Sequence, residues 1–146
     1  MNSKEIMKQD NRIINRILII AALIIFVASL EAFMLAKSSE LLDIYMKINP
    51  GDTQNDYVNV VLINFLLNIF EPILISIYVF FTYRKYGANK LFRFIFGGIV
   101  FIRLANIVLR FNYGSIFYYL LVILYILFFV VIVTTPLKRK VKNGLL

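Results

Sequence analysis

Three polar side chains recur at helical spacing within residues 58–81, an otherwise apolar segment. Asn64, Asn68 and Glu71 fall at positions i, i+4 and i+7, so a helix would carry them on one face. Pro72 follows Glu71 directly, and a proline inside a helix leaves the carbonyl four residues earlier, here that of Asn68, without its usual donor. An unbonded carbonyl beside an amide and a carboxylate is suited to binding a cation, a proton or water.

A second polar stripe lies in and just beyond residues 91–109. Arg103, Asn106 and Arg110 fall at positions i, i+3 and i+7, which again places them on one helical face. Arginine and asparagine side chains both carry N–H donors. The carbonyl of Asn68 therefore has an alternative to binding a ligand, because either Arg103 or Asn106 could donate a hydrogen bond to it.

Formal charges at membrane depth are costly, and they normally face the protein interior and find partners there. Residues 17–35 contribute one more such charge, Glu31. At about 1.5 Å per residue, Glu71 lies about 21 Å along its segment and Arg103 about 18 Å along the antiparallel one, so their levels agree within roughly one helical turn. We expect the two glutamates to face the two arginines, Arg103 and Arg110. The cluster is then either a buried salt bridge that fixes helix register or a site for an ion, a proton or a small polar substrate.

Four long apolar segments must position these side chains. A helix needs about 20 mostly apolar residues to cross a bilayer, and four segments qualify: residues 17–35, 58–81, 91–109 and 116–133. The composition agrees, because 61% of the residues are hydrophobic and only 16% are charged. We predict an all-α fold, an integral membrane four-helix bundle, with a single domain over residues 1–146.

The first segment resembles a signal peptide in having a basic arm and an apolar run. We interpret it instead as a retained helix, because the run exceeds the usual signal core and no small-x-small cleavage site follows it. One face of this segment carries four alanines: Ala21, Ala28, Ala32 and Ala36. Small side chains let helix backbones approach closely, so we expect this face to pack against the polar stripes.

Two further patterns concern the third and fourth segments. Gly97 and Gly98 indicate a close packing point between helices more readily than a hinge. The segment 116–133 has no polar residue comparable to those of the other three, so we expect much of its surface to face lipid or a partner. Tyr118 and Tyr119 at its start suit the aromatic belt of a membrane interface.

The connection formed by residues 37–56 is the only one long enough for structure of its own. Apolar side chains recur in it at helical spacing: Leu41, Ile44, Tyr45 and Ile48. This piece either extends the first helix or lies on the membrane surface. The Pro-Gly pair at 50–51 predicts a turn, after which Asp52, Thr53 or Asp56 would cap the second span.

Basic residues gather at three places: before the first segment, between the second and third, and after the fourth. Twelve of the sixteen are there: Lys4, Lys8, Arg12, Arg16, Arg84, Lys85, Lys90, Arg93, Lys138, Arg139, Lys140 and Lys142. The positive-inside rule therefore predicts that both chain ends are cytoplasmic. Because most of these residues border apolar runs, we expect them to meet lipid headgroups and we expect no binding of nucleic acid.

The chain contains neither cysteine nor histidine. This excludes disulfides, thiol nucleophiles and metal or haem sites built on those residues. No phosphate-binding glycine loop, nucleophile elbow or metal-ligand spacing is present either. We expect no cofactor and no metal, and the sequence disfavours an enzyme.

Three kinds of function fit this pattern. The first, which we take as our expectation, is an accessory or assembly subunit of a larger membrane complex, because the chain is small and its loops are short. The second is a small oligomeric transporter or channel, coupled to protons or ions through Glu71. The third is a lipid-active enzyme or lipid carrier. The partners would be the bilayer and either another membrane protein or a second copy. The 23 isoleucines, with many Asn, Lys, Phe and Tyr residues, suggest an AT-rich bacterial genome, so we expect a bacterial cytoplasmic membrane.

Overall fold

The computed structural model describes residues 3–83, 90–109 and 115–136, with side chains from residue 11 onward. All regular structure in these residues is helical. The elements are α1 (Ser3–Lys37), α2 (Ser39–Ile48), α3 (Gln54–Tyr78) with the π-helical turn η1 (Val79–Tyr83), α5 (Lys90–Leu109) and α6 (Ile116–Thr134). Four of these helices are long and apolar enough to span a membrane: α1, α3 with η1, α5 and α6.

The four predicted spans are confirmed as helices, although two of them are longer than the apolar runs that predicted them. The membrane-spanning part of α1 covers Asn11–Lys37, and α3 with η1 covers Gln54–Tyr83. In both cases the helix continues into flanking polar residues, because helix ends are set by caps and turns rather than by hydropathy. The predicted connections at residues 84–89 and 110–114 lie outside the described residues.

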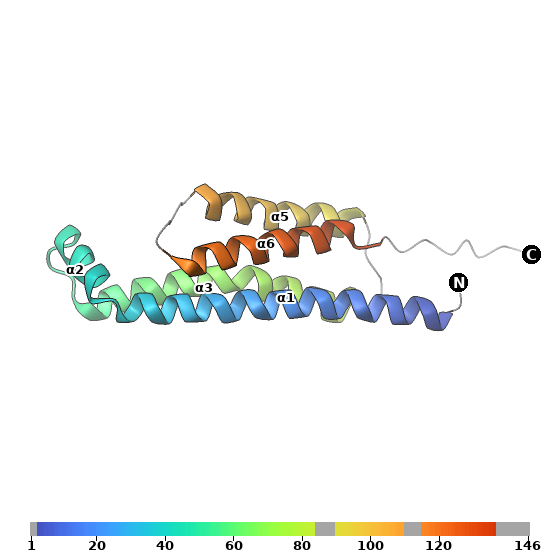
Figure 1. Ribbon diagram of the computed structural model, residues 1–146, viewed down its shortest axis with the longest axis horizontal. Helices are drawn as coiled ribbons and strands as arrows, with labels where there is room; N and C mark the ends of the chain where they lie inside the picture. The colour runs from blue at the N-terminus through green and yellow to red at the C-terminus, as the bar shows by residue number, and fades with distance from the viewer. Residues whose placement is uncertain (1–2, 84–89, 110–114, 137–146) are drawn as a thin grey trace, which may run out of the picture.

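The helices pack in the spatial order α3, α1, α6, α5 (Figure 1). α1 contacts α3 along one side and α6 along another, while α5 packs mainly on α6. The start of α1 and the end of α6 lie at the same end of the bundle, and α2 lies at the opposite end. The core runs through this contact region and includes Ile17, Ile24, Ile75, Phe128 and Ile132.

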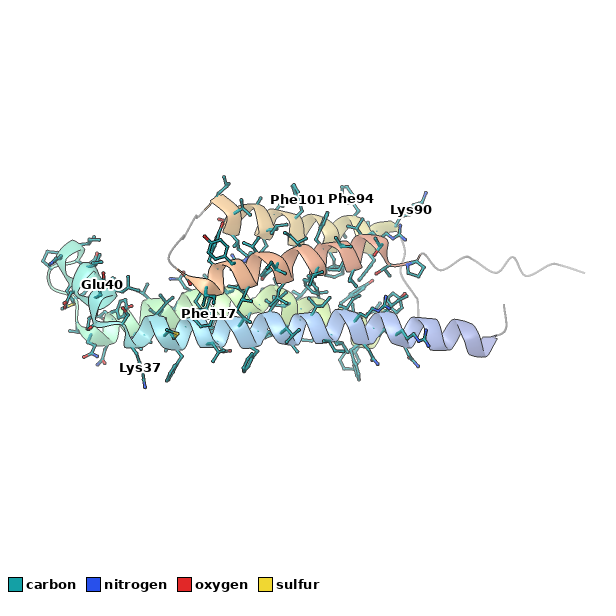
Figure 2. All side chains as sticks on the ribbon, in the orientation of Figure 1. Lys37, Glu40, Lys90, Phe94, Phe101 and Phe117 are labelled. Carbon is teal, nitrogen blue, oxygen red and sulfur yellow. The ribbon has the colours of Figure 1, made fainter. Side chains whose placement is uncertain are left out.

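Apolar side chains also cover the outside of the bundle, as a membrane-spanning surface requires. Phe94 lies on the outer side of α5 and is 81% exposed (Figure 2). The labelled charged side chains lie toward the ends instead, with Lys37 and Glu40 at the α2 end and Lys90 at the other. Lipid can cover such a surface, because exposed apolar side chains match its hydrocarbon.

The residues that follow α1 form a separate helix, α2, rather than an extension of α1. Ser38 ends α1 and caps α2, with its hydroxyl oxygen accepting from the Leu41 amide at 3.3 Å. None of the residues of α2 is buried. The ring of Tyr45 packs on that of Tyr57 in α3, with 5.4 Å between the ring centroids. A serine at the junction provides the N-cap of a new helix, which is why the two helices separate here.

The turn between α2 and α3 is fixed by hydrogen bonds. Gly51 adopts a φ of +122°, a conformation open to glycine and not to residues with a side chain. The Tyr45 hydroxyl donates to Asp52 at 2.5 Å, and this bond raises the pKa of Tyr45. Of the three predicted caps, Thr53 is confirmed: its side chain and that of Asp56 form a reciprocal capping box at the start of α3.

Contacts between α5 and α6 include one close approach and one capping interaction. A Cβ on Gly97 would lie 3.3 Å from the Val133 side chain, whereas one on Gly98 would meet nothing within 4 Å. The predicted packing point is therefore confirmed for Gly97 and wrong for Gly98. Arg93 donates to the carbonyl of Thr135, which follows the last residue of α6, with 2.6 Å from Nε. A cation is favourable there because helix C-termini carry partial negative charge.

Candidate functional site

A cavity of about 230 Å³ lies between all four long helices. It is bounded by apolar side chains such as Ile24 and Leu121. Six polar residues also line it: Glu31, Asn68, Arg103, Asn106, Tyr118 and Tyr125. Glu31 is near the end of α1, Asn106 near the end of α5 and Tyr118 near the start of α6, so the cavity lies in the half of the bundle closer to α2.

Asn68 is the residue on which the polar contacts of this cavity converge. The Arg103 guanidinium of α5 donates to its side-chain oxygen. The Tyr125 hydroxyl of α6 donates to its main-chain oxygen at 3.4 Å. That main-chain oxygen is the carbonyl freed by Pro72, and in the structure its donor is Tyr125, not Arg103 or Asn106. Side chains from two other helices thus bond to one residue of α3.

The buried ionic groups at this level are incompletely satisfied. Arg103 Nε and Glu71 Oε1 are buried and have no hydrogen-bond partner. Arg103 and Glu71 interact electrostatically. However, within the described residues no ion pair joins Arg103 to a carboxylate, and its hydrogen bond goes to Asn68 instead. Unbonded polar atoms are uncommon in protein interiors, so these two atoms are the least satisfied part of the polar cluster.

The seven residues of the predicted polar cluster, which are the two stripes and Glu31, fall into three groups. Glu31, Asn68, Arg103 and Asn106 line the main cavity. Glu31 and Asn68 also line a smaller cavity of about 70 Å³ between α1 and α3, together with the exposed Asn64.

The two remaining predicted residues do not line the main cavity in the described structure. Glu71 is half-buried next to it, close enough to interact with Arg103 and Tyr125. Arg110 lies outside the described residues, and so does the predicted contact between a glutamate and this arginine. The alanine face of α1 does approach the site, since Ala28 lines both cavities.

Two tyrosines of α6 belong to the site and were not predicted to do so. Tyr118 was expected at the membrane interface, yet it is buried and lines the cavity, whereas Tyr119 next to it is 47% exposed. Tyr125 is only 2% exposed and corrects the interpretation of this segment as free of comparable polar residues. A signal was present in the sequence, because Tyr125 stands nine residues into α6, about 13 Å deep, far from an interfacial belt.

The cavity combines a guanidinium, a carboxylate, two amides and two phenols with apolar walls. Ligand sites in general combine apolar surface with a few polar groups that fix orientation, and this cavity is more polar than that, because six of its ten lining residues are polar. No group of three or more acidic side chains that could hold a metal ion occurs in the described part of the chain. The arrangement therefore suits a small polar or anionic organic molecule.

The fold and this cavity together define a class: an all-helical protein with four helices that are long and apolar enough to cross a membrane, and a polar cavity between them. No family model, curated protein or solved structure matches the chain.

Proposed function

We propose that the protein is a small membrane transport protein that binds a small anionic or polar solute in the cavity, with Arg103 as the anchoring cation. The observation that carries this proposal is the state of Arg103, which lines the cavity without an ion pair to any described carboxylate. A guanidinium at membrane depth is costly unless a counter-charge is nearby. Glu71 lies close enough to interact with Arg103 but forms no ion pair with it, so the carboxylate or other anion of a solute would provide the directly bonded partner that the guanidinium lacks.

Glu71 gives the proposal its second part, coupling of the solute to a proton. Its carboxyl group is half-buried beside Arg103 and has an unbonded oxygen. An anion bound to Arg103 and an ionised Glu71 would repel each other. We infer that the solute enters together with a proton that Glu71 takes up.

The direction of transport follows from the proposed orientation. We place both chain ends on the cytoplasmic side, because most basic residues lie next to the chain ends and in the connection between the second and third spans. α2 then lies outside, and the cavity lies in the outer half of a membrane, which we propose to be a bacterial cytoplasmic membrane. In this state the site is closer to the external solution, as expected for a protein that takes up its solute.

Proteoliposomes containing a pH-sensitive dye test this function. Acetate, lactate, succinate and glutamate are added outside in turn, and the internal pH is followed. We expect at least one of them to cause a protein-dependent acidification, and Arg103→Gln to abolish it. Arg93→Gln is the matched control, because it makes the same change on α5 at a residue that does not line the cavity.

Both variants must first show a cooperative thermal transition, so that loss of folding is not mistaken for loss of transport. An equal response of Arg103→Gln and Arg93→Gln would contradict the role of Arg103. Acidification that persists in Glu71→Gln would contradict proton coupling through that residue and leave the anion site standing.

The accessory-subunit function is a second candidate, and one observation favours it. Asn64 is exposed on α3, about 15 Å from the start of the helix, and its amide bonds to no described residue. Lipid offers this amide no hydrogen bonds, whereas another membrane helix would. A partner subunit, or a second copy of the chain, packed beside the small cavity between α1 and α3 that Asn64 lines would satisfy it.

Gentle solubilisation followed by mass spectrometry of co-purifying proteins tests this candidate. We expect a stoichiometric partner that is lost in Asn64→Leu and retained in Leu66→Ala, which changes an exposed side chain on the opposite side of α3. Purification of the protein alone, or a partner retained equally by both variants, would contradict a subunit role that depends on Asn64.

A further inference from the structure

A second cavity, of about 290 Å³, lies at the end of the bundle opposite α2. It is formed where the third and fourth turns of α1 pass the end of α6 (Figure 1). α1 contributes Arg12, Ile13 and Arg16 to its lining. The end of α6 and the residues that follow it contribute Val131, Thr134 and Pro136. None of these residues lines the cavity that contains Arg103, so the two sites are separate.

The charge of this cavity comes from two arginines with no partner among the described residues. Arg12 and Arg16 are four residues apart on one helix, so both guanidiniums project from the same face. Both are exposed, and neither makes a hydrogen bond or an ion pair within the described chain. Each guanidinium has five N–H donors in a planar fork that matches phosphate oxygens. Like charges at this spacing repel, and a bound anion would relieve the repulsion.

The described residues of the opposite wall include no carboxylate that would pair with these guanidiniums. The hydroxyls of Thr134 and Thr135 donate back to carbonyls within α6. The carbonyl of Thr135 is occupied by Arg93, which also offsets the partial negative charge of this helix end. Among the described residues, no acidic group of this cavity therefore competes with an external anion for the two arginines of α1.

The position and the apolar part of the lining identify the source of that anion. Arg12 and Arg16 directly precede the apolar run that begins at Ile17, so they lie at the level of lipid headgroups. The side chains of Ile13, Val131 and Pro136 add an apolar surface beside the charges. A phospholipid has both parts that this site accommodates, whereas a free phosphate ion would leave the apolar surface unused. Basic pockets between membrane helices bind anionic headgroups in this manner.

We propose that the cavity between residues 12–16 of α1 and the end of α6 is a binding site for one anionic phospholipid, with its phosphate on Arg12 and Arg16. Native mass spectrometry of the detergent-purified full chain tests this directly. Phosphatidylglycerol, phosphatidylcholine and inorganic phosphate are added separately. We expect one phosphatidylglycerol to bind with an affinity at least about tenfold higher than phosphatidylcholine.

The double variant Arg12→Ala/Arg16→Ala should lose this preference. Its control is Lys47→Ala/Lys90→Ala, which removes the same charge from exposed residues that do not line the cavity and should keep the preference. All four side chains are exposed, so the substitutions leave the core intact. Equal binding of the two lipids, equal behaviour of the two double variants, or displacement of phosphatidylglycerol by millimolar inorganic phosphate would each overturn the proposal.

Discussion

At the scale of single residues, Asn68 links three helices of the bundle. It accepts from Arg103 of α5 through its side chain and from Tyr125 of α6 through its main chain. The second contact exists because Pro72 removes the helical donor of that carbonyl. A kinked or interrupted backbone is tolerated at membrane depth where neighbouring side chains satisfy the freed groups, and Tyr125 does so here.

Removing the phenol of Tyr125 tests this link. Tyr125→Phe leaves the Asn68 carbonyl unbonded, so we expect the free energy of unfolding to fall by about 0.5–1 kcal/mol, at the low end for hydrogen bonds because the contact is 3.4 Å long. The measurement is chemical unfolding in mild detergent. Tyr119→Phe, nearly two turns toward the start of α6 on its exposed side, should have no effect. Equal stability of the two variants would contradict the link.

At the scale of elements, apolar length predicted the four long helices, and helical spacing predicted which polar residues share one face of a helix. They did not predict how the helices would be ordered in space. The separate α2 depends on the cap at Ser38, and hydropathy does not register a single hydroxyl. Gly97 and Gly98 looked equivalent in the sequence, but only Gly97 faces α6, since adjacent residues project 100° apart on a helix.

This difference between the two glycines gives a prediction about α5. Gly97→Leu places a side chain where Val133 already lies 3.3 Å from an added Cβ, so we expect a loss of about 1–3 kcal/mol from overpacking. Gly98→Leu meets nothing within 4 Å and gains helix propensity, so stability should be unchanged or higher. Unfolding of both variants in the same detergent decides the matter. Similar losses for both would show that the packing of α5 on α6 differs from that described.

At the scale of the whole molecule, the candidate site depends on helix order more than on any motif. Depths counted from the sequence predicted that Glu71 and Arg103 would lie at one level, and the two residues do interact. Asn68, Arg103 and Asn106 of the two stripes line one cavity. The stripes missed Tyr125, because only the packing of α6 between α1 and α5 brings that phenol to α3. They also paired Arg103 with a glutamate, whereas its guanidinium donates a hydrogen bond to the side-chain amide of Asn68. Which helices become neighbours is a property of the assembled bundle.

The central claim is that a water-accessible cavity lies inside the bundle, in the half closer to α2. The chain contains no cysteine, so single cysteines can be introduced without a background. The most direct measurement is the reaction of Ala28→Cys and Leu30→Cys with a membrane-impermeant thiol reagent added to the outside of oriented vesicles. Ala28 lines the cavity, whereas Leu30 is exposed on the opposite side of α1 and lies closer to the helix end.

Thiols react as thiolates, which form in water and not in hydrocarbon. We therefore predict that Ala28→Cys is modified and Leu30→Cys is not, although the second position is about 3 Å nearer the external solution. Modification of Leu30→Cys alone, or of neither variant, would contradict a water-accessible cavity at Arg103 and with it the proposed solute site.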